Sequence, residues 1–448
     1  MKKLYVVHCV DTEGPLYESL EETFSRINSI FGFKIHPSKE NLIKLQNKEI
    51  DLKGKEDAVK DLVRPERVNM NKNWSEIDEM LEKLNSDEFR TMLTGDINQK
   101  WVFNWFCLDH VGFTGENPRR RDLGDHKIFD KYVNWVNKSN NGDSIQWHYH
   151  PLPITGNVHN GGTAYLNSNN IWEILAKKII DKNWFPSVYR PGFHAIRPDS
   201  NWFIDQWFPF DFSNQSIKDS SSEQPDLSNG RYGYWVDAPD DWSYYKPNYK
   251  NYQISGDCFR YTFRCLNAEA RLRVLSDEEI IKAFERSNNS IDTVLSFTNH
   301  DFRDMYKETS SVIKRIKDIS ENYPDVQIIP IDALTACRKV LKLKSSLPKL
   351  NCVINNFEKS SELIVISDGS IHGSQPFLAF KLQNGSYVYD NFDKIGNKRW
   401  RFLFDEYNLP WHLVDKIGIA ANSPSGITEV NVYDKSLNSW KKRIINEF

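Results

Sequence analysis

The regular alternation of short apolar segments with helical segments is the feature that most constrains this fold. Segments 4–10, 101–108, 144–150, 187–190, 208–212, 293–298 and 326–331 are apolar or β-branched runs that predict buried strands. The intervening segments 130–136, 169–180, 277–286 and 305–322 have the spacing of amphipathic helices. Strands that alternate with helices at such distances are typical of parallel β/α units. We therefore predict an α/β fold for the first three quarters of the chain.

The pattern changes near residue 342, where a lysine-rich stretch, 342–349, predicts a linker. Beyond it, the short alternating runs 363–367, 377–382, 387–389, 417–421 and 429–433 are separated by Gly, Asn and Asp turns and predict a β-sandwich over 350–448. Near the other end, residues 17–90 are polar with helical spacing and predict a helical insertion. A chain of 448 residues exceeds the usual size of one core, so we expect two domains, 1–341 and 350–448.

Composition narrows the function classes. Lys and Arg total 58 against 61 Asp and Glu, so the net charge of −3 gives no reason to expect a nucleic-acid partner. No stretch of about 18 apolar residues predicts a transmembrane segment. The six cysteines are scattered as expected of reduced thiols, and the apolar run at the N-terminus is too short for a signal peptide, so we expect a cytoplasmic protein. Aromatic residues reach 13%, which is compatible with sugar stacking or with ordinary packing.

Two histidines give the strongest local signal. His148 and His150 lie two residues apart in a predicted strand, so both side chains can point to one face, where a pair of imidazoles can chelate a metal. Taken alone, the pair is better explained by two histidines that form hydrogen bonds at a sheet edge. Asp11 and Glu13 follow the first predicted strand with the same spacing, although such residues often cap a turn.

Two further predicted strands also end in polar residues, Arg190 and His300. The carboxyl ends of parallel strands meet where β/α barrels build their sites, so these side chains are expected to gather there. Carboxylate and imidazole ligands would leave positions open on a zinc-like ion, and the second carboxylate could act as a base. Arg190 could orient that carboxylate, and His300 could protonate a leaving amine. Considered alone, Arg190 is more simply explained as part of a surface ion pair, and His300 as a residue next to a helix cap.

In this order, the residues resemble polysaccharide deacetylases of the NodB-homology class, carbohydrate esterase family 4. The matching segments are Asp11-Thr-Glu-Gly-Pro15, His148-Tyr-His-Pro151, Arg190-Pro-Gly-Phe193 and Ser296-Phe-Thr-Asn-His300. The chain departs from the family pattern in three ways: Asp-Thr-Glu stands for Asp-Asp, one residue rather than three separates the histidines, and Arg190 meets its proline directly. The chain thus resembles an outlying subfamily of the kind associated with lipopolysaccharide or capsule assembly.

The resemblance implies an irregular (β/α)7-type barrel that removes an N-acetyl group from an amino sugar of a glycan or glycolipid precursor. It implies a divalent metal, zinc by preference, for which we assign Glu13, His148 and His150 as ligands. Either Asp11 or Glu13 could be the ligand; we take Asp11 as the base. Arg190 and His300 complete the catalytic set, and we expect Asp109, Asp237 and Trp242 to line the substrate cleft.

Two other functions remain open at this stage. A metal-independent glycoside hydrolase would pair Asp11 or Glu13 with Asp109 or Asp237. A non-catalytic carbohydrate-binding protein would retain a degenerate barrel site, in keeping with the altered histidine spacing. The C-terminal domain could bind sugar, pack against the barrel or mediate oligomerisation.

Overall fold

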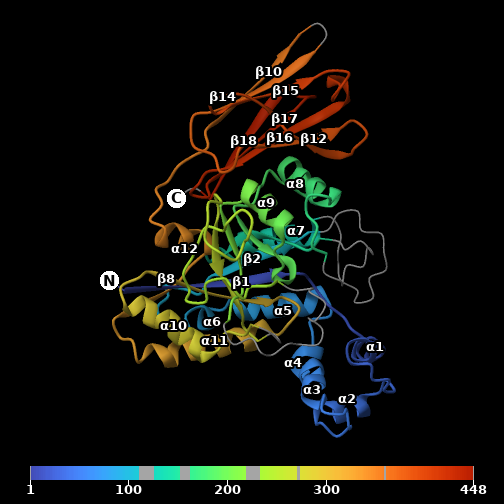
Figure 1. Cartoon of the computed structure of the whole chain (residues 1–448), viewed down its shortest axis with the longest axis vertical. Coiled ribbons are helices and arrows are strands. Elements are labelled where there is room, and N and C mark those ends of the chain that lie inside the picture. The colour runs from blue at the N-terminus through green and yellow to red at the C-terminus, as the bar shows by residue number, and fades with distance from the viewer. Residues whose placement is uncertain are drawn as a thin grey trace.

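A computed structural model of the chain describes residues 2–109, 126–151, 162–217, 233–269, 273–357 and 360–446. Three parts follow one another along the longest axis: a small helical projection, a central β/α part and an antiparallel β part (Figure 1). Within the described ranges, no helix has the length and apolar character required to cross a bilayer.

The central part is built on one parallel sheet. Its strands are β1 (Lys2–Thr12), β2 (Phe103–Leu108), β3 (Ser144–Tyr149), β4 (Val188–Pro191), β5 (Phe210–Asn214), β6 (Tyr261–Arg264), β7 (Leu266–Asn267), β8 (Thr293–His300) and β9 (Val326–Pro330). Their spatial order is β6-β5-β4-β3-β2-β1-β8-β7, with β9 paired to β1. The two ends of this order, β6 and β7, are joined in sequence through Cys265 alone, and Ser296 on β8 donates a hydrogen bond to the Arg264 carbonyl. The sheet is therefore a nearly closed barrel.

β1 is the central strand of this barrel. On one edge it pairs with β8 from Leu4 to Asp11. On the other edge, the first half of β1 pairs with β9 and the second half pairs with β2. Between Leu4 and Val10 every residue except His8 is apolar, because the strand is covered on both faces of the sheet. Alternate side chains face opposite ways: Tyr5, Val7 and Cys9 join the barrel interior, while the residues between them pack under the outer helices.

Helices surround the barrel and form the projection. They are α1 (Leu20–Phe31), α2 (Lys39–Gln46), α3 (Glu56–Val63), α4 (Pro65–Val68), α5 (Trp74–Leu84), α6 (Asp87–Arg90), α7 (Lys127–Ser139), α8 (Asn169–Lys182), α9 (Pro198–Trp207), α10 (Asp277–Asn288), α11 (Met305–Ser320) and α12 (Ala333–Val340), with a short 3-10 turn at Gly192–His194. α1 to α4 have a small core of their own that includes Phe24, Ile27, Val59 and Leu62. This core explains how the projection can stand away from the barrel (Figure 1).

The C-terminal part consists of two antiparallel sheets. Their strands are β10 (Leu350–Asn356), β11 (Ser361–Ser367), β12 (Phe377–Leu382), β13 (Tyr387–Asp390), β14 (Asp393–Gly396), β15 (Arg399–Phe404), β16 (Val414–Asn422), β17 (Thr428–Asp434) and β18 (Ser439–Ile445), with a 3-10 turn at Trp411–Leu413. The sheet orders are β10-β11-β15-β14 and β13-β12-β16-β17-β18. Together with the barrel, these sheets confirm the predicted α/β fold with a C-terminal β domain.

The C-terminal sheets pack tightly against the barrel. Phe377 and Ala420 belong to the same hydrophobic cluster as α8, and Gly418 approaches α8 so closely that a Cβ there would lie 2.5 Å from Ile179. The buried amide of Asn422 donates hydrogen bonds to the backbone carbonyls of Pro186 and Trp207, at 2.7 and 2.9 Å. One hydrophobic cluster therefore extends from the barrel into the facing C-terminal sheet, while the two C-terminal sheets enclose a separate cluster that includes Leu363, Phe380 and Phe402.

Candidate metal centre

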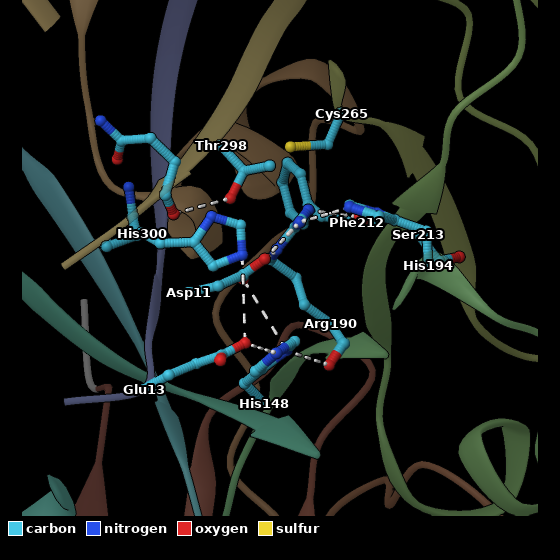
Figure 2. Close-up of polar contacts among 12 residues, drawn as sticks. Asp11, Glu13, His148, Arg190, His194, Phe212, Ser213, Cys265, Thr298 and His300 are labelled. Carbon is cyan, nitrogen blue, oxygen red and sulfur yellow. Dashed lines mark hydrogen bonds and ion pairs between the residues drawn. The ribbon is translucent and has the colours of Figure 1, made fainter. Parts of the chain in front are cut away.

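The register of the barrel strands brings the polar residues together. In β1 and β8, Asp11 is the Cα partner of His300, and in β3 and β4, His148 is the partner of Arg190. Asp11 continues the inward-facing series of Tyr5, Val7 and Cys9, so its side chain lies at the carboxyl mouth of the barrel. Figure 2 shows these side chains converging from four strands.

Three residues offer a set of ligand atoms for a cation. Glu13, His148 and His150 are all buried, and each presents one atom such that the three atoms lie within 4.8 Å of one another. The Nε2 atoms of His148 and His150 are 2.9 Å apart. Glu13 Oε1 lies 3.2 Å from His150 Nε2 and 3.7 Å from His148 Nε2. Two nitrogens bound to one tetrahedral zinc ion at about 2.1 Å would be separated by about 3.4 Å. Small shifts thus suffice for this group to hold a metal ion.

The tautomer of His148 suits metal binding. Its Nδ1 lies 3.0 Å from the backbone carbonyl of Arg190. A carbonyl oxygen can only accept, so Nδ1 carries the hydrogen, and the lone pair of Nε2 faces His150 and Glu13. Such a hydrogen bond to the outer nitrogen is the usual support for a metal-binding histidine.

Gly192 shapes the site behind His150. A Cβ at this glycine would lie 2.5 Å from His150 Cγ and 2.7 Å from its Nδ1, well inside any ordinary contact. The backbone of the turn after β4 can therefore approach the imidazole only because residue 192 has no side chain.

Asp11 and Arg190 form a buried ion pair beside the metal set. Arg190 Nε donates to Asp11 Oδ1 at 2.7 Å, and Nη2 donates to Oδ2 at 3.0 Å, while Nη1 donates to the Phe212 carbonyl (Figure 2). Burial opposes ionisation of Asp11, but the charge and hydrogen bonds of Arg190 outweigh it and hold the pKa of Asp11 well below its usual range. Since both oxygens of Asp11 are engaged by Arg190, Glu13 is the better placed of the two carboxylates to bind a metal.

His300 lies on the open side of the cluster. Its side chain is 22% exposed, whereas those of Asp11, Glu13 and His148 are 2–4% exposed, and its Nε2 lies 3.9 Å from Glu13 Oε1. Burial lowers the pKa of His300 to about 4 against the opposing effect of the Glu13 and Asp11 charges. The imidazole is therefore neutral at neutral pH.

Asp301 fixes the turn that carries Glu13, a role that our sequence analysis missed. Its carboxyl accepts hydrogen bonds from the backbone N–H groups of Glu13 and Gly14, both at 2.9 Å, and from the Tyr132 hydroxyl at 2.8 Å. Gly14 has a φ of +75°, and a Cβ there would lie 3.2 Å from the Trp74 ring. Burial raises the pKa of Asp301 to about 6, although hydrogen bonds from Glu13 and Tyr132 lower it. Its position directly after His300 was the available sequence signal.

His194 is a second residue that the sequence analysis did not select. Its ring is buried, and its Nε2 lies 2.9 Å from the Gln215 amide and 3.5 Å from Arg190 Nη2. Amide and guanidinium groups can only donate there, so Nε2 accepts and Nδ1 carries the hydrogen. Desolvation, with the charge of Arg190, lowers the pKa of His194 well below its usual value, so it supports Arg190 as a neutral ring.

The three expected substrate-binding residues do not join this cluster. The Asp109 carboxylate contacts Lys178 Nζ at 2.5 Å and His126 Nδ1 at 3.1 Å, in a buried group. The Trp242 ring is buried beneath the Arg264 guanidinium, with its Nε1 donating to the Glu279 carbonyl at 2.8 Å. Asp237 is exposed, and its backbone N–H donates to Gln253. These contacts are typical of packing and turn residues.

Comparison with known proteins assigns no family. No protein-family model matches the chain. A segment of 89 residues, 20% of the chain, is 27% identical to part of autophagy-related protein 9 from two strains of Saccharomyces cerevisiae. The matched segment spans only 8% of the length of that protein. The candidate site consequently rests on its own geometry.

Proposed function

We propose that the chain is a metal-dependent hydrolase that removes an N-acetyl group from an amino sugar of a glycan or glycolipid precursor. The observation that carries this proposal is the convergence of Glu13, His148 and His150 at the carboxyl mouth of the barrel, beside an ionised Asp11. This donor set suits zinc, which accepts imidazole and carboxylate ligands and keeps a position open for catalysis. A zinc ion bound there would polarise the acyl carbonyl and lower the pKa of a water molecule.

The residues around the metal set have roles that follow from their contacts. Arg190 holds Asp11 ionised and oriented through two hydrogen bonds, so Asp11 is available as the base toward water. In the reaction, water adds to the carbonyl carbon, the C–N bond breaks, and the proton that water loses finally reaches the amine. His300 is on the open side, where a substrate would enter. Since it starts neutral, it must first gain that proton before it can protonate the leaving nitrogen.

The test combines metal analysis with acetate release. We expect the purified protein to contain about one zinc or similar ion per chain and to release acetate from the tetramer of β-1,4-linked N-acetylglucosamine. The His148→Ala/His150→Ala double variant should lose both properties. A matched control, His412→Ala, changes an exposed histidine in the C-terminal part and should keep both.

Three outcomes would overturn the proposal. Absence of metal after reloading, or acetate release that survives complete chelation, would contradict a metal-dependent reaction. New reducing ends without acetate would point instead to a glycoside hydrolase.

A further inference from the structure

A pocket of about 530 Å³ lies between the barrel and the C-terminal sheets, and none of its lining residues belongs to the candidate metal centre. One wall is formed by α9 and the segment before β6, and the other by the loops around β12 and β13. Its volume is within the range of sites for small ligands, about 300–1,000 Å³.

Exposed aromatic rings give this pocket an unusual surface. Trp202 on α9 and Tyr249 are 37% and 52% exposed, and their rings stack with centroids 5.4 Å apart at an interplanar angle of 20°. Phe259 is 61% exposed. On the inner side, Trp172 and Tyr389 stack at 4.2 Å and join α8 to β13. Two stacked pairs of aromatic rings therefore line the pocket, and Tyr389 of the second pair comes from the C-terminal part.

The rings are held in place before any ligand binds. Trp202 Nε1 donates to the Tyr249 carbonyl at 2.9 Å, and the Asn201 amide donates to the same carbonyl at 3.1 Å. Across the pocket, Gln206 Nε2 donates to Ser374 Oγ at 2.9 Å. Gly373 lies so close to α9 that a Cβ would be 2.0 Å from the Gln206 carbonyl. A preformed surface of this kind avoids the entropy cost of ordering on binding.

The polar groups of the pocket select among ligand classes. Its described lining residues include two carboxylates, Asp205 and Asp257, but no lysine, arginine or histidine. Anionic ligands such as nucleotides, phosphates or sulfated glycans are therefore disfavoured. Side-chain amides lie at the rim, where Gln375 Nε2 and the Tyr389 hydroxyl both donate to Asn391 Oδ1, at 2.7 and 2.6 Å. Planar amides beside aromatic faces suit a neutral ligand with many hydroxyl groups.

We propose that this pocket is a second carbohydrate-binding site, which takes an uncharged saccharide chain by packing its pyranose rings against the exposed surface of the Trp202–Tyr249 pair. The site lies apart from the candidate metal centre and goes beyond the proposed hydrolysis, since it would hold a glycan whether or not the barrel acts on it. Its position at the junction of the two parts gives the C-terminal sheets a role in binding as well as in packing.

Calorimetric titration tests this proposal. The ligands are the N-acetylglucosamine tetramer, cellotetraose and a sulfated heparin tetrasaccharide, and the protein is the full chain with the His148→Ala/His150→Ala change, so that turnover cannot obscure binding. We expect binding of one or both neutral tetramers, weakened by at least about tenfold in both Trp202→Ala and Tyr249→Ala. Tyr407→Ala, which removes a fully exposed ring on the C-terminal part, is the matched control and should bind normally.

The proposal is overturned if neither neutral saccharide binds, if the two substitutions leave binding unchanged, or if the sulfated saccharide binds best. Tryptophan quenching by a proline-rich peptide in place of saccharides would reassign the pocket to a protein partner. Acetate release separates this proposal from the proposed function: a failed hydrolysis assay with intact, Trp202-dependent binding would refute the enzyme and retain the second site.

Discussion

Replacing Gly192 with alanine should push the His150 imidazole out of the candidate metal centre. The new Cβ would lie 2.5 Å from His150 Cγ, whereas ordinary carbon contacts begin near about 3.5 Å, so the ring must move by about 1 Å. Metal–ligand distances tolerate only about 0.2 Å. Losing a residue that only supports a metal ligand lowers metal affinity by about 10–100-fold. Loss of the ligand itself should cost more, so we expect zinc affinity to fall at least about 100-fold.

Zinc affinity is measured by competition with a chromophoric chelator. Gly192 does not have a positive φ, so alanine introduces a steric change without backbone strain. Overpacking should lower the free energy of unfolding of the metal-free protein by about 1–3 kcal/mol. Gly396→Ala is the control, because its Cβ would meet its nearest neighbour, Arg399 Cβ, at an ordinary 3.6 Å.

A double-mutant cycle identifies the cause. If Gly192→Ala acts through His150, the combined Gly192→Ala/His150→Ala variant should bind zinc no more weakly than His150→Ala alone. Wild-type affinity in Gly192→Ala, or strictly additive losses in the double variant, would refute the steric explanation.

Three further predictions concern stability. Asp11→Asn should destabilise the metal-free protein by about 3–5 kcal/mol in urea unfolding, because it leaves the buried Arg190 without its counter-charge; a loss under about 1 kcal/mol would contradict this. His372 donates to the Asp205 carbonyl at 2.9 Å, and burial lowers its pKa to about 3. The folded protein holds His372 in its neutral form, whereas in the unfolded chain the histidine has a pKa of about 6.5. The contribution of His372 to stability is therefore complete above about pH 6.5 and is lost as the pH falls toward 3. Between pH 7 and 4.5 the wild type should therefore lose up to about 3 kcal/mol more than His372→Gln, measured by unfolding at each pH; parallel curves would refute the assignment. Finally, a chelator should lower the unfolding temperature of the wild type but not that of the His148→Ala/His150→Ala variant, and an equal shift in both would show that the metal is bound elsewhere.

Much of the barrel follows from local sequence pattern. The apolar runs at 4–10, 144–150 and 293–298 predict strands that the structure places at β1, β3 and β8. Short or polar elements escaped prediction: β18 is mostly exposed and carries three basic residues, and α9 begins with Pro198 and mixes Asn, Asp and aromatic residues. Such elements form because neighbouring strands or an adjacent domain supply their partners, which no local window contains.

The sequence by itself determined which side chains share a face. Strand alternation places His148 with His150 and Asp11 with the inward-facing residues of β1, because successive side chains of a strand point in opposite directions. Tertiary structure alone decided the rest. Because Arg190 forms hydrogen bonds to Asp11, Glu13 is the carboxylate that faces the two histidines. Asp109 forms an ion pair with Lys178 instead of joining the cluster. Tertiary packing also builds the aromatic pocket from α9 and the C-terminal loops. These contacts join residues far apart in the chain, so they depend on how the layers pack.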